Sequence, residues 1–175
     1  MVIKGKDLIN HIEGKEFSEE LIKELEKYEI RKPKTVWGLQ EGDDYWDIYF
    51  DGEYYTVGSE TFRNGSYDRE CRLLCKAHLT PKRAELHARV LNTELDIKEW
   101  KRENDNVEFD WEDENQRKYY LMYNDERDDI AADWWSRLKL ANTIYFSSRK
   151  KLEQCVKDVG EDRIIEYLKW EDNDQ

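Results

Sequence analysis

Cysteine and histidine residues cluster in one short stretch of the chain, and both types bind zinc. Cys71 and Cys75 are followed by His78, and His87 lies nine residues further on. Zinc requires four such groups that converge tetrahedrally on one ion. On an extended strand Cys71 and Cys75 would share a face but stand about 13 Å apart. We therefore expect buried thiols in this stretch and no metal site.

Other spacings that could support catalysis are weak. The Glu-x-Lys half of a nuclease signature occurs at Glu13 and at Glu99, but a chain with 41 acids produces such matches by chance. No Gly-rich phosphate loop and no Gly-x-Ser-x-Gly motif occurs. Carboxylate pairs are so frequent that spacing alone assigns none of them to acid–base chemistry. We expect no catalytic residues and no cofactor. A metal-dependent enzyme that acts on nucleic acid or nucleotides is the alternative.

Composition limits the classes of partner. The chain has 175 residues with 41 acids against 29 bases, a net charge of -12. Its mean hydropathy is -1.05, yet 7 Trp, 11 Tyr and 5 Phe supply the apolar area that a folded core needs. The acidic balance argues against direct binding of nucleic-acid phosphates or of an anionic membrane surface.

Targeting signals are not evident in the sequence. No apolar run reaches the length that spans a bilayer, and Met1–Asp7 lacks the apolar stretch of a signal peptide. Three cysteines without a secretion signal are typical of reduced thiols. We therefore expect a cytoplasmic protein, in the host-cell cytoplasm if a phage encodes it.

Helical spacing of apolar residues predicts two short helices in the N-terminal segment, residues 1–34. The first would end at Gly14. The second would begin after Ser18, a favourable N-cap, and end before Pro33.

A period of two replaces the helical period after this segment. The alternation over Trp46–Phe50 predicts a strand, and Asp51–Gly52 predicts a hairpin turn. We expect a third strand over Cys71–Leu79 and a helix that begins at Thr80–Pro81. These elements form the first predicted unit, residues 35–102.

The same order of elements is predicted again in residues 103–175. It consists of a strand at Tyr119–Tyr123, a returning strand near Trp134, a strand over residues 142–146, and a final helix after Ser148. The predicted fold class is therefore α+β: N-terminal helices followed by two degenerate hairpin/strand-plus-helix repeats, packed as one compact body.

Acidic residues gather in three stretches: Glu41–Glu53, Glu103–Gln116 and Asp125–Asp133. In the second stretch acids alternate with aromatic and apolar residues, which would place a row of carboxylates on one face of a strand. Their spacing of about 6.6 Å is comparable with that of nucleic-acid phosphates. We interpret the row as a surface that imitates a nucleic-acid backbone and binds a basic protein. A solvated face that keeps the protein soluble is the alternative.

Adjacent tryptophans provide a second kind of surface. Trp134 and Trp135 would point to opposite faces of a strand, so that one lies outside the core and becomes an anchor for a partner or for a second copy in a homodimer. The candidate partner-binding residues are Asp43, Asp44, Asp47, Asp51, Glu108, Asp110, Glu112, Asp113, Asp128, Asp129 and Trp134.

Two segments carry a resemblance to known proteins. Tyr45–Gly52 and the helix start Leu79–Glu85 resemble small acidic accessory proteins of bacteriophages and mobile elements of Gram-positive hosts. The resemblance covers about residues 45 to 100 and, more weakly, residues 119 to 170. Some acidic phage proteins of this size inhibit host defence, including anti-CRISPR proteins.

The resemblance implies a non-catalytic inhibitor of a basic, nucleic-acid-handling host protein such as a CRISPR effector nuclease. It carries over no binding residues. A structural or assembly protein that oligomerises through its aromatic surface is a further alternative.

Overall fold

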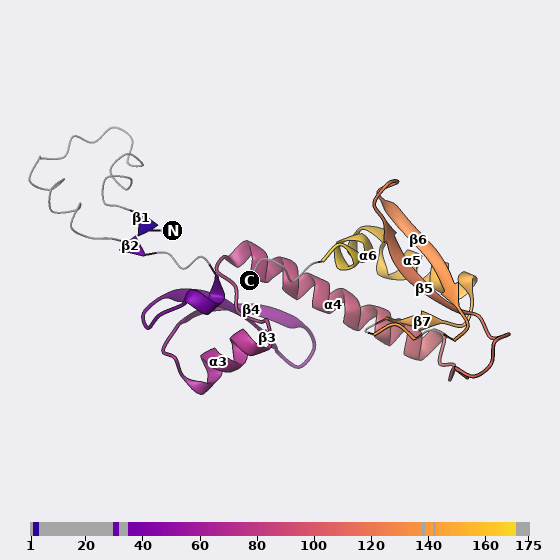
Figure 1. Ribbon diagram of the computed structural model, residues 1–175, viewed down its shortest axis with the longest axis horizontal. Helices are drawn as coiled ribbons and strands as arrows, with labels where there is room; N and C mark the ends of the chain where they lie inside the picture. The colour runs from indigo at the N-terminus through magenta and orange to yellow at the C-terminus, as the bar shows by residue number, and fades with distance from the viewer. Residues whose placement is uncertain (1, 4–29, 32–34, 138, 142, 171–175) are drawn as a thin grey trace, which may run out of the picture.

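The computed structural model has mixed α+β architecture, as the sequence predicts (Figure 1). It describes residues 2–3, 30–31, 35–137, 139–141 and 143–170. In this part of the chain there are four α-helices and two small antiparallel sheets, besides a short pairing of β1 (Val2–Ile3) with β2 (Ile30–Arg31).

The order of elements differs from the prediction of N-terminal helices first. After β2 come a 3-10 helix η1 (Val36–Gly38), a hairpin, two helices, a three-stranded sheet and two more helices. The two helices predicted before Pro33 fall within residues 4–29, which lie outside the described residues.

The predicted first hairpin is confirmed. Strand β3 (Asp44–Phe50) pairs antiparallel with β4 (Tyr55–Thr61). The loop between them has four residues rather than the predicted two. The Asp51 carboxylate accepts hydrogen bonds from two backbone N–H groups of this loop, at 3.0 and 2.9 Å. Gly52 adopts a φ of 110°, which side chains other than glycine rarely tolerate.

The predicted third strand over Cys71–Leu79 is wrong. Helix α3 (Ser66–Leu73) occupies the start of this stretch. Its first turn is stabilised by Asp68, whose carboxylate accepts from the backbone N–H of Gly65 at 2.8 Å. Only His78 joins the sheet, through two backbone hydrogen bonds to Trp46 at 2.7 and 2.8 Å.

Helix α4 (Pro81–Asn104) forms the axis of the molecule (Figure 1). It begins as predicted, because the Thr80 hydroxyl accepts from the backbone N–H of Arg83 at 3.3 Å and proline occupies the first turn. Its 24 residues extend about 36 Å, so the elements packed on its two ends are well separated.

The sheet at the C-terminal end of α4 has the order β6-β5-β7. It contains β5 (Lys118–Asn124), β6 (Asp129–Trp135) and the short β7 (Tyr145–Phe146). The predicted strand at residues 119–123 is confirmed within β5, whereas only two residues of the predicted strand at 142–146 are extended.

The final predicted helix is two helices. Helix α5 (Arg149–Val159) starts at the Ser148 cap, and α6 (Glu161–Leu168) follows. Gly160 separates them with a φ of 106°, outside the helical region.

Buried side chains form three clusters rather than one core. One lies inside the hairpin and α3, a second joins the hairpin to the N-terminal half of α4, and a third joins the C-terminal half of α4 to the sheet, α5 and α6. The first cluster includes Tyr45 and Phe62, and the second includes Ile48 and Ala84. The third includes Ile97, Phe146 and Leu152.

Within the described residues, no helix combines the length and the apolar character needed to cross a membrane.

Candidate partner-binding surface

The acidic stretch after α4 is a loop, residues 105–117, and the strand predicted over it is wrong. Asp105 begins the loop and is 3% exposed. Its carboxylate accepts from the backbone N–H of Ser147 at 2.8 Å and from the hydroxyl of the same residue. This contact fixes the end of α4 against the segment that leads into α5.

Carboxylates within the loop turn the chain. Asp110 accepts from the backbone N–H of Glu112 at 2.9 Å, and Asp113 accepts from that of Asn115 at 2.8 Å. Such local bonds between a side chain and the backbone compete with the hydrogen-bond ladder of a sheet. They explain why an alternating sequence does not form a strand here.

The alternation nevertheless sorts the loop into two faces. Phe109 and Trp111 are half-buried, and the Trp111 ring meets the Tyr145 ring edge-on with centroids 5.0 Å apart. Glu108, Asp110 and Glu112 are exposed. Within the described residues, none of these three carboxylates forms an ion pair with lysine or arginine.

A fully buried lysine anchors the loop to the sheet. Lys118 donates from Nζ to the carbonyl oxygens of Ser136 at 2.6 Å and of Asp113 at 3.2 Å. Its Nζ also lies 5.3 Å from the centre of the Trp111 ring. The sequence contains no local signal for this role, because Ser136 is 18 residues away, directly after β6.

The end of β6 lies beside the loop. An ion pair between Arg137 and Glu114 joins the two segments. The sequence predicts that one of the two adjacent tryptophans lies outside the core, and in the structure Trp134 and Trp135 are each 43% exposed. Trp135 donates from Nε1 to the hydroxyl of Tyr120 at 2.8 Å, which holds its ring at the surface.

We call the resulting patch the acidic loop surface. It comprises Glu108, Asp110 and Glu112 of the loop, and Trp134 and Trp135 at the end of β6, which the Arg137–Glu114 ion pair joins to the loop. Arg117 borders it, with its guanidinium 4.5 Å from the centre of the Trp134 ring. The predicted candidate Asp113 also lies in this loop and is half-buried.

Asp47 is buried, which contradicts its predicted place in an exposed acidic row. It is 2% exposed and accepts a hydrogen bond from the Tyr67 hydroxyl of α3. A Cβ atom on Gly58 of the neighbouring strand would lie only 2.9 Å from its Oδ1. Strand β3 is covered by α4 on one face and by α3 on part of the other, so this alternating strand has no fully solvated face.

The remaining predicted acids of the hairpin are distant from the acidic loop surface. Asp43 accepts from the backbone of Gln40 at 2.7 Å, and Asp44 accepts from the Thr61 hydroxyl at 3.1 Å. Hydrogen bonds from the backbone of the hairpin loop lower the pKa of Asp51. All three acids belong to the hairpin, which packs on the opposite half of α4.

Asp128 lies in the turn between β5 and β6 and Asp129 begins β6, at the other end of this hairpin from the loop. Lys169 contacts Asp128 at 2.6 Å and lowers the pKa of its carboxyl. Arg127 lies 3.5 Å from Asp129. Their charges are therefore balanced by neighbouring cations.

Of the predicted residues, Glu108, Asp110, Glu112 and Asp113 lie on one loop, and Trp134 lies at the end of β6 beside it. The structure places the other predicted residues elsewhere.

The cysteine and histidine residues do not converge on one point. Cys71 is buried in α3, and burial raises the pKa of its thiol. The two histidines contact each other instead. Within the described part of the chain, no three His, Cys, Asp or Glu side chains are placed to hold a metal ion.

Comparison with models of protein families finds no match for this chain. Searches of curated proteins and of solved structures also find no significant match.

Proposed function

We propose that this protein is a non-catalytic interaction protein that binds a basic, nucleic-acid-handling protein through its acidic loop surface. One observation carries the proposal. Glu108, Asp110 and Glu112 are exposed on one loop, Trp134 and Trp135 are exposed at the end of the strand that an ion pair joins to this loop, and no lysine or arginine of the described residues pairs with the three carboxylates. Such a patch complements a groove lined with basic side chains.

The charge of the chain is concentrated around this surface. Residues 103–117 contain seven acids and one base, which leaves a net charge of -6. Residues 81–102, which form most of α4, contain four acids and six bases. A basic partner is therefore attracted toward the end of the molecule that carries the loop.

The tryptophans supply affinity that exposed charges do not. Solvated charges mainly accelerate encounter and select the partner. Large aromatic side chains that become buried on binding dominate the free energy of many interfaces. Trp134 and Trp135 are exposed at the end of β6, which an ion pair joins to the acidic loop, and this arrangement matches an interface that combines aromatic and charged residues.

The loop conformation changes the kind of mimicry that we propose. The carboxylates do not follow the regular spacing of a strand, because Asp110 and Asp113 turn the chain. The surface is therefore a compact anionic patch that occupies a phosphate-binding groove, rather than a long copy of a nucleic-acid backbone. A CRISPR effector nuclease in the host cytoplasm is the class of partner that the sequence resemblance suggests.

The test is binding to an immobilised, guide-loaded CRISPR effector nuclease, together with inhibition of its DNA cleavage. The variant E108Q/D110N/E112Q removes three charges from the acidic loop surface. The control E41Q/E53Q/E60Q removes three exposed charges in and next to the hairpin. Within the described residues, none of these three glutamates forms an ion pair. We expect about tenfold weaker binding for the loop variant, and about twofold or less for the control.

Salt and the aromatic side chains give two further readouts. Raising the salt from about 50 to about 300 mM is expected to weaken binding of the wild type more than binding of the loop variant. The variant W134A/W135A should weaken binding at both salt concentrations. Equal losses in the loop variant and the control would contradict the proposed surface. Absence of binding by the wild type would contradict this choice of partner.

A further inference from the structure

An arginine of α3 is fixed at the surface by stacking on aromatic rings. The guanidinium of Arg72 lies 4.5 Å from the centre of the buried Phe62 ring and 5.8 Å from that of the Trp37 ring. Among its nitrogens, only Nε is buried without a hydrogen-bond partner. Within the described residues, Arg72 forms no ion pair. The guanidinium is thus held in place with its terminal N–H groups available for a carboxylate, whose planar geometry they match.

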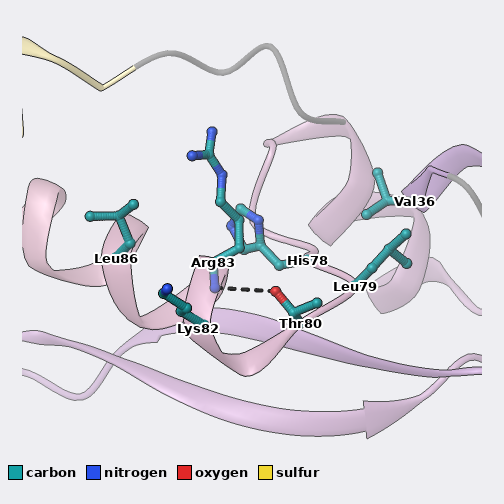
Figure 2. A pocket seen from close by; sticks show the side chains of 7 residues that line it. All are labelled: Val36, His78, Leu79, Thr80, Lys82, Arg83 and Leu86. Carbon is teal, nitrogen blue, oxygen red and sulfur yellow. Dashed lines mark hydrogen bonds between the residues drawn. The ribbon is translucent and has the colours of Figure 1, made fainter.

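The 3-10 helix η1 presents Trp37 beside this arginine. Val36, the preceding residue, is 3% exposed and packs in one cluster with Phe62. It also lines a pocket of about 360 Å³ at the start of α4 together with Leu79 (Figure 2). Because Val36 faces the interior, Trp37 faces solvent and is 54% exposed. Its ring can therefore take part in an interface while it remains in contact with Arg72.

Two further side chains of α3 extend this surface. Arg69 lies three residues before Arg72, and Leu73 lies four residues after Arg69, so that both are neighbours of Arg69 or Arg72 on the helix. Arg69 is exposed, and Leu73 is 71% exposed. No acid in the described part of the chain pairs with Arg69. We call Trp37, Arg69, Arg72 and Leu73 the Arg72 surface.

The local charge at this end of the molecule is opposite to that of the acidic loop. Residues 62–80 contain four lysine or arginine residues and two acids, a net charge of +2, whereas residues 103–117 carry a net charge of -6. One of the two acids, Asp68, is buried and accepts from the Tyr45 hydroxyl at 3.0 Å. The chain is strongly acidic as a whole, yet its hairpin end presents cations beside an exposed aromatic ring.

The two surfaces cannot meet within one molecule. Helix α3 lies with the hairpin near the start of α4, and the acidic loop follows the end of α4 (Figure 1). About 36 Å of helix separates these two ends. The acidic loop surface offers carboxylates and tryptophans, and the Arg72 surface offers guanidinium groups, a tryptophan and a leucine. Charge complementarity of this kind guides association between molecules.

We propose that the acidic loop surface of one copy of this protein binds the Arg72 surface of a second copy. A carboxylate of the loop accepts from the terminal N–H groups of Arg72, and the exposed aromatic rings of both surfaces are removed from water. Because two different surfaces meet, the contact is head-to-tail and leaves one unoccupied surface at each end of the pair. Longer chains of molecules should therefore form as the concentration rises.

Self-association occupies the acidic loop surface, which is also the surface proposed to bind a host protein. A host protein would therefore compete with the second copy. Self-association does not depend on that host protein and is measured on the pure chain. Either property can consequently be lost without the other.

Sedimentation equilibrium of the full chain tests the contact. We expect the weight-average mass to rise above the 21.3 kDa of one chain between about 10 and about 500 µM protein, and to rise less at about 300 mM than at about 50 mM salt. Arg69→Glu/Arg72→Glu and Glu108→Lys/Glu112→Lys should each weaken association about tenfold or more. The second variant keeps Asp110, whose carboxylate turns the loop.

An equimolar mixture of the two variants gives the sharpest readout. Each variant retains one intact surface, and the two intact surfaces complement each other, so association should return in the mixture. The controls change the charge by the same amount elsewhere: Lys150→Glu/Lys157→Glu on α5, and Glu41→Lys/Glu60→Lys in and next to the hairpin. Both controls should associate within about twofold of the wild type.

Other results would overturn the proposal. A wild type that stays monomeric over the whole concentration range would do so, as would two folded variants whose mixture does not associate. A closed two-chain complex that neither variant weakens would also overturn it, because self-association would then use another surface. If the double arginine variant unfolds, Arg69→Glu, which leaves the stacked Arg72 in place, replaces it alone and in the mixture.

Discussion

The two ends of α4 carry segments with the same sequence pattern and different structures. Residues 46–50 and residues 107–112 both carry aromatic or apolar residues at every second position, which alternate with Asp47 and Tyr49 in the first segment and with Glu108, Asp110 and Glu112 in the second. The first segment lies in strand β3, which is paired with β4 along its length. The second is a loop whose aromatic side chains contact the end of the neighbouring sheet.

The acidic side chains of the two segments therefore differ in their exposure to solvent. In β3, α3 covers the face that carries Asp47, and the Tyr67 hydroxyl binds the buried carboxylate. In the loop, no described element covers the face that carries Glu108, Asp110 and Glu112. Alternation thus indicates which residues share a face, whereas exposure depends on what packs against that face.

Truncation of one buried aromatic ring at each end gives the largest expected effect. Phe62 belongs to the hairpin cluster and Phe146 to the C-terminal cluster, and the two clusters share no residue. We expect Phe62→Ala and Phe146→Ala each to lower the free energy of unfolding by about 3 to 5 kcal/mol. Hydrogen exchange should increase first at the end that carries the substitution. An equal increase at both ends would show that α4 couples them into one cooperative unit.

Removal of the buried lysine should release the acidic loop from the sheet. Lys118→Met leaves the carbonyl oxygens of Ser136 and Asp113 without their donor, at a cost of about 1 to 3 kcal/mol. Amides of residues 105–117 should then exchange faster, while those of β3 keep their protection. Lys139→Met is the matched control, since its exposed Nζ lies 5.7 Å from the Trp111 ring. Equal loop exchange in both variants would contradict the anchoring role.

One substitution made in both segments compares their aspartates directly. Asp47→Ala removes the acceptor of the Tyr67 hydroxyl in a buried site and should cost about 2 kcal/mol. Asp110→Ala removes an exposed turn contact and should cost about 0.5 kcal/mol or less. Chemical denaturation measures both values. Similar costs would show that burial does not distinguish the two segments.

A smaller effect is expected from the ion pair between α4 and α6. Arg89 binds both oxygens of Glu166 at 2.9 Å and lowers the pKa of this carboxyl. Because the folded-state pKa is depressed, the stabilisation is present above the unfolded pKa of about 4.3 and is lost as pH falls through the folded value. Both groups are partly exposed, so Glu166→Gln should cost less than about 1 kcal/mol at pH 7.

Denaturation of both proteins at pH 7 and pH 3 measures this difference. It should shrink at pH 3, where the wild-type glutamate also becomes neutral. A difference that is the same at both pH values would assign the effect to packing rather than to charge.

Local chemistry made several elements predictable. Thr80 with Pro81, and Ser148, satisfy backbone N–H groups of their own helices, and both helix starts are confirmed. The strand around Tyr119–Tyr123 is also confirmed, because its aromatic residues favour extended structure. Elements whose ends depend on a single residue were missed, such as the break at Gly160 and the short helix that begins at Ser66.

The candidate site was predictable in part. The sequence identified Glu108, Asp110, Glu112 and Trp134 as surface residues, and all four are exposed. Lys118 escaped prediction, because lysine is seldom buried and its acceptor at Ser136 lies 18 residues away, directly after β6.

By itself, the sequence determined where two helices begin, where the hairpins lie and how strongly acidic the chain is, because these properties depend on neighbouring residues and on composition. Tertiary structure decided that Asp47 is buried, that both tryptophans remain at the surface and that Glu108, Asp110 and Glu112 form no ion pair with the described residues. Each outcome depends on a contact between residues that are distant in sequence. Tyr67 of α3 binds Asp47, and Tyr120 accepts from Trp135. Ser136 accepts from Lys118, which anchors the loop.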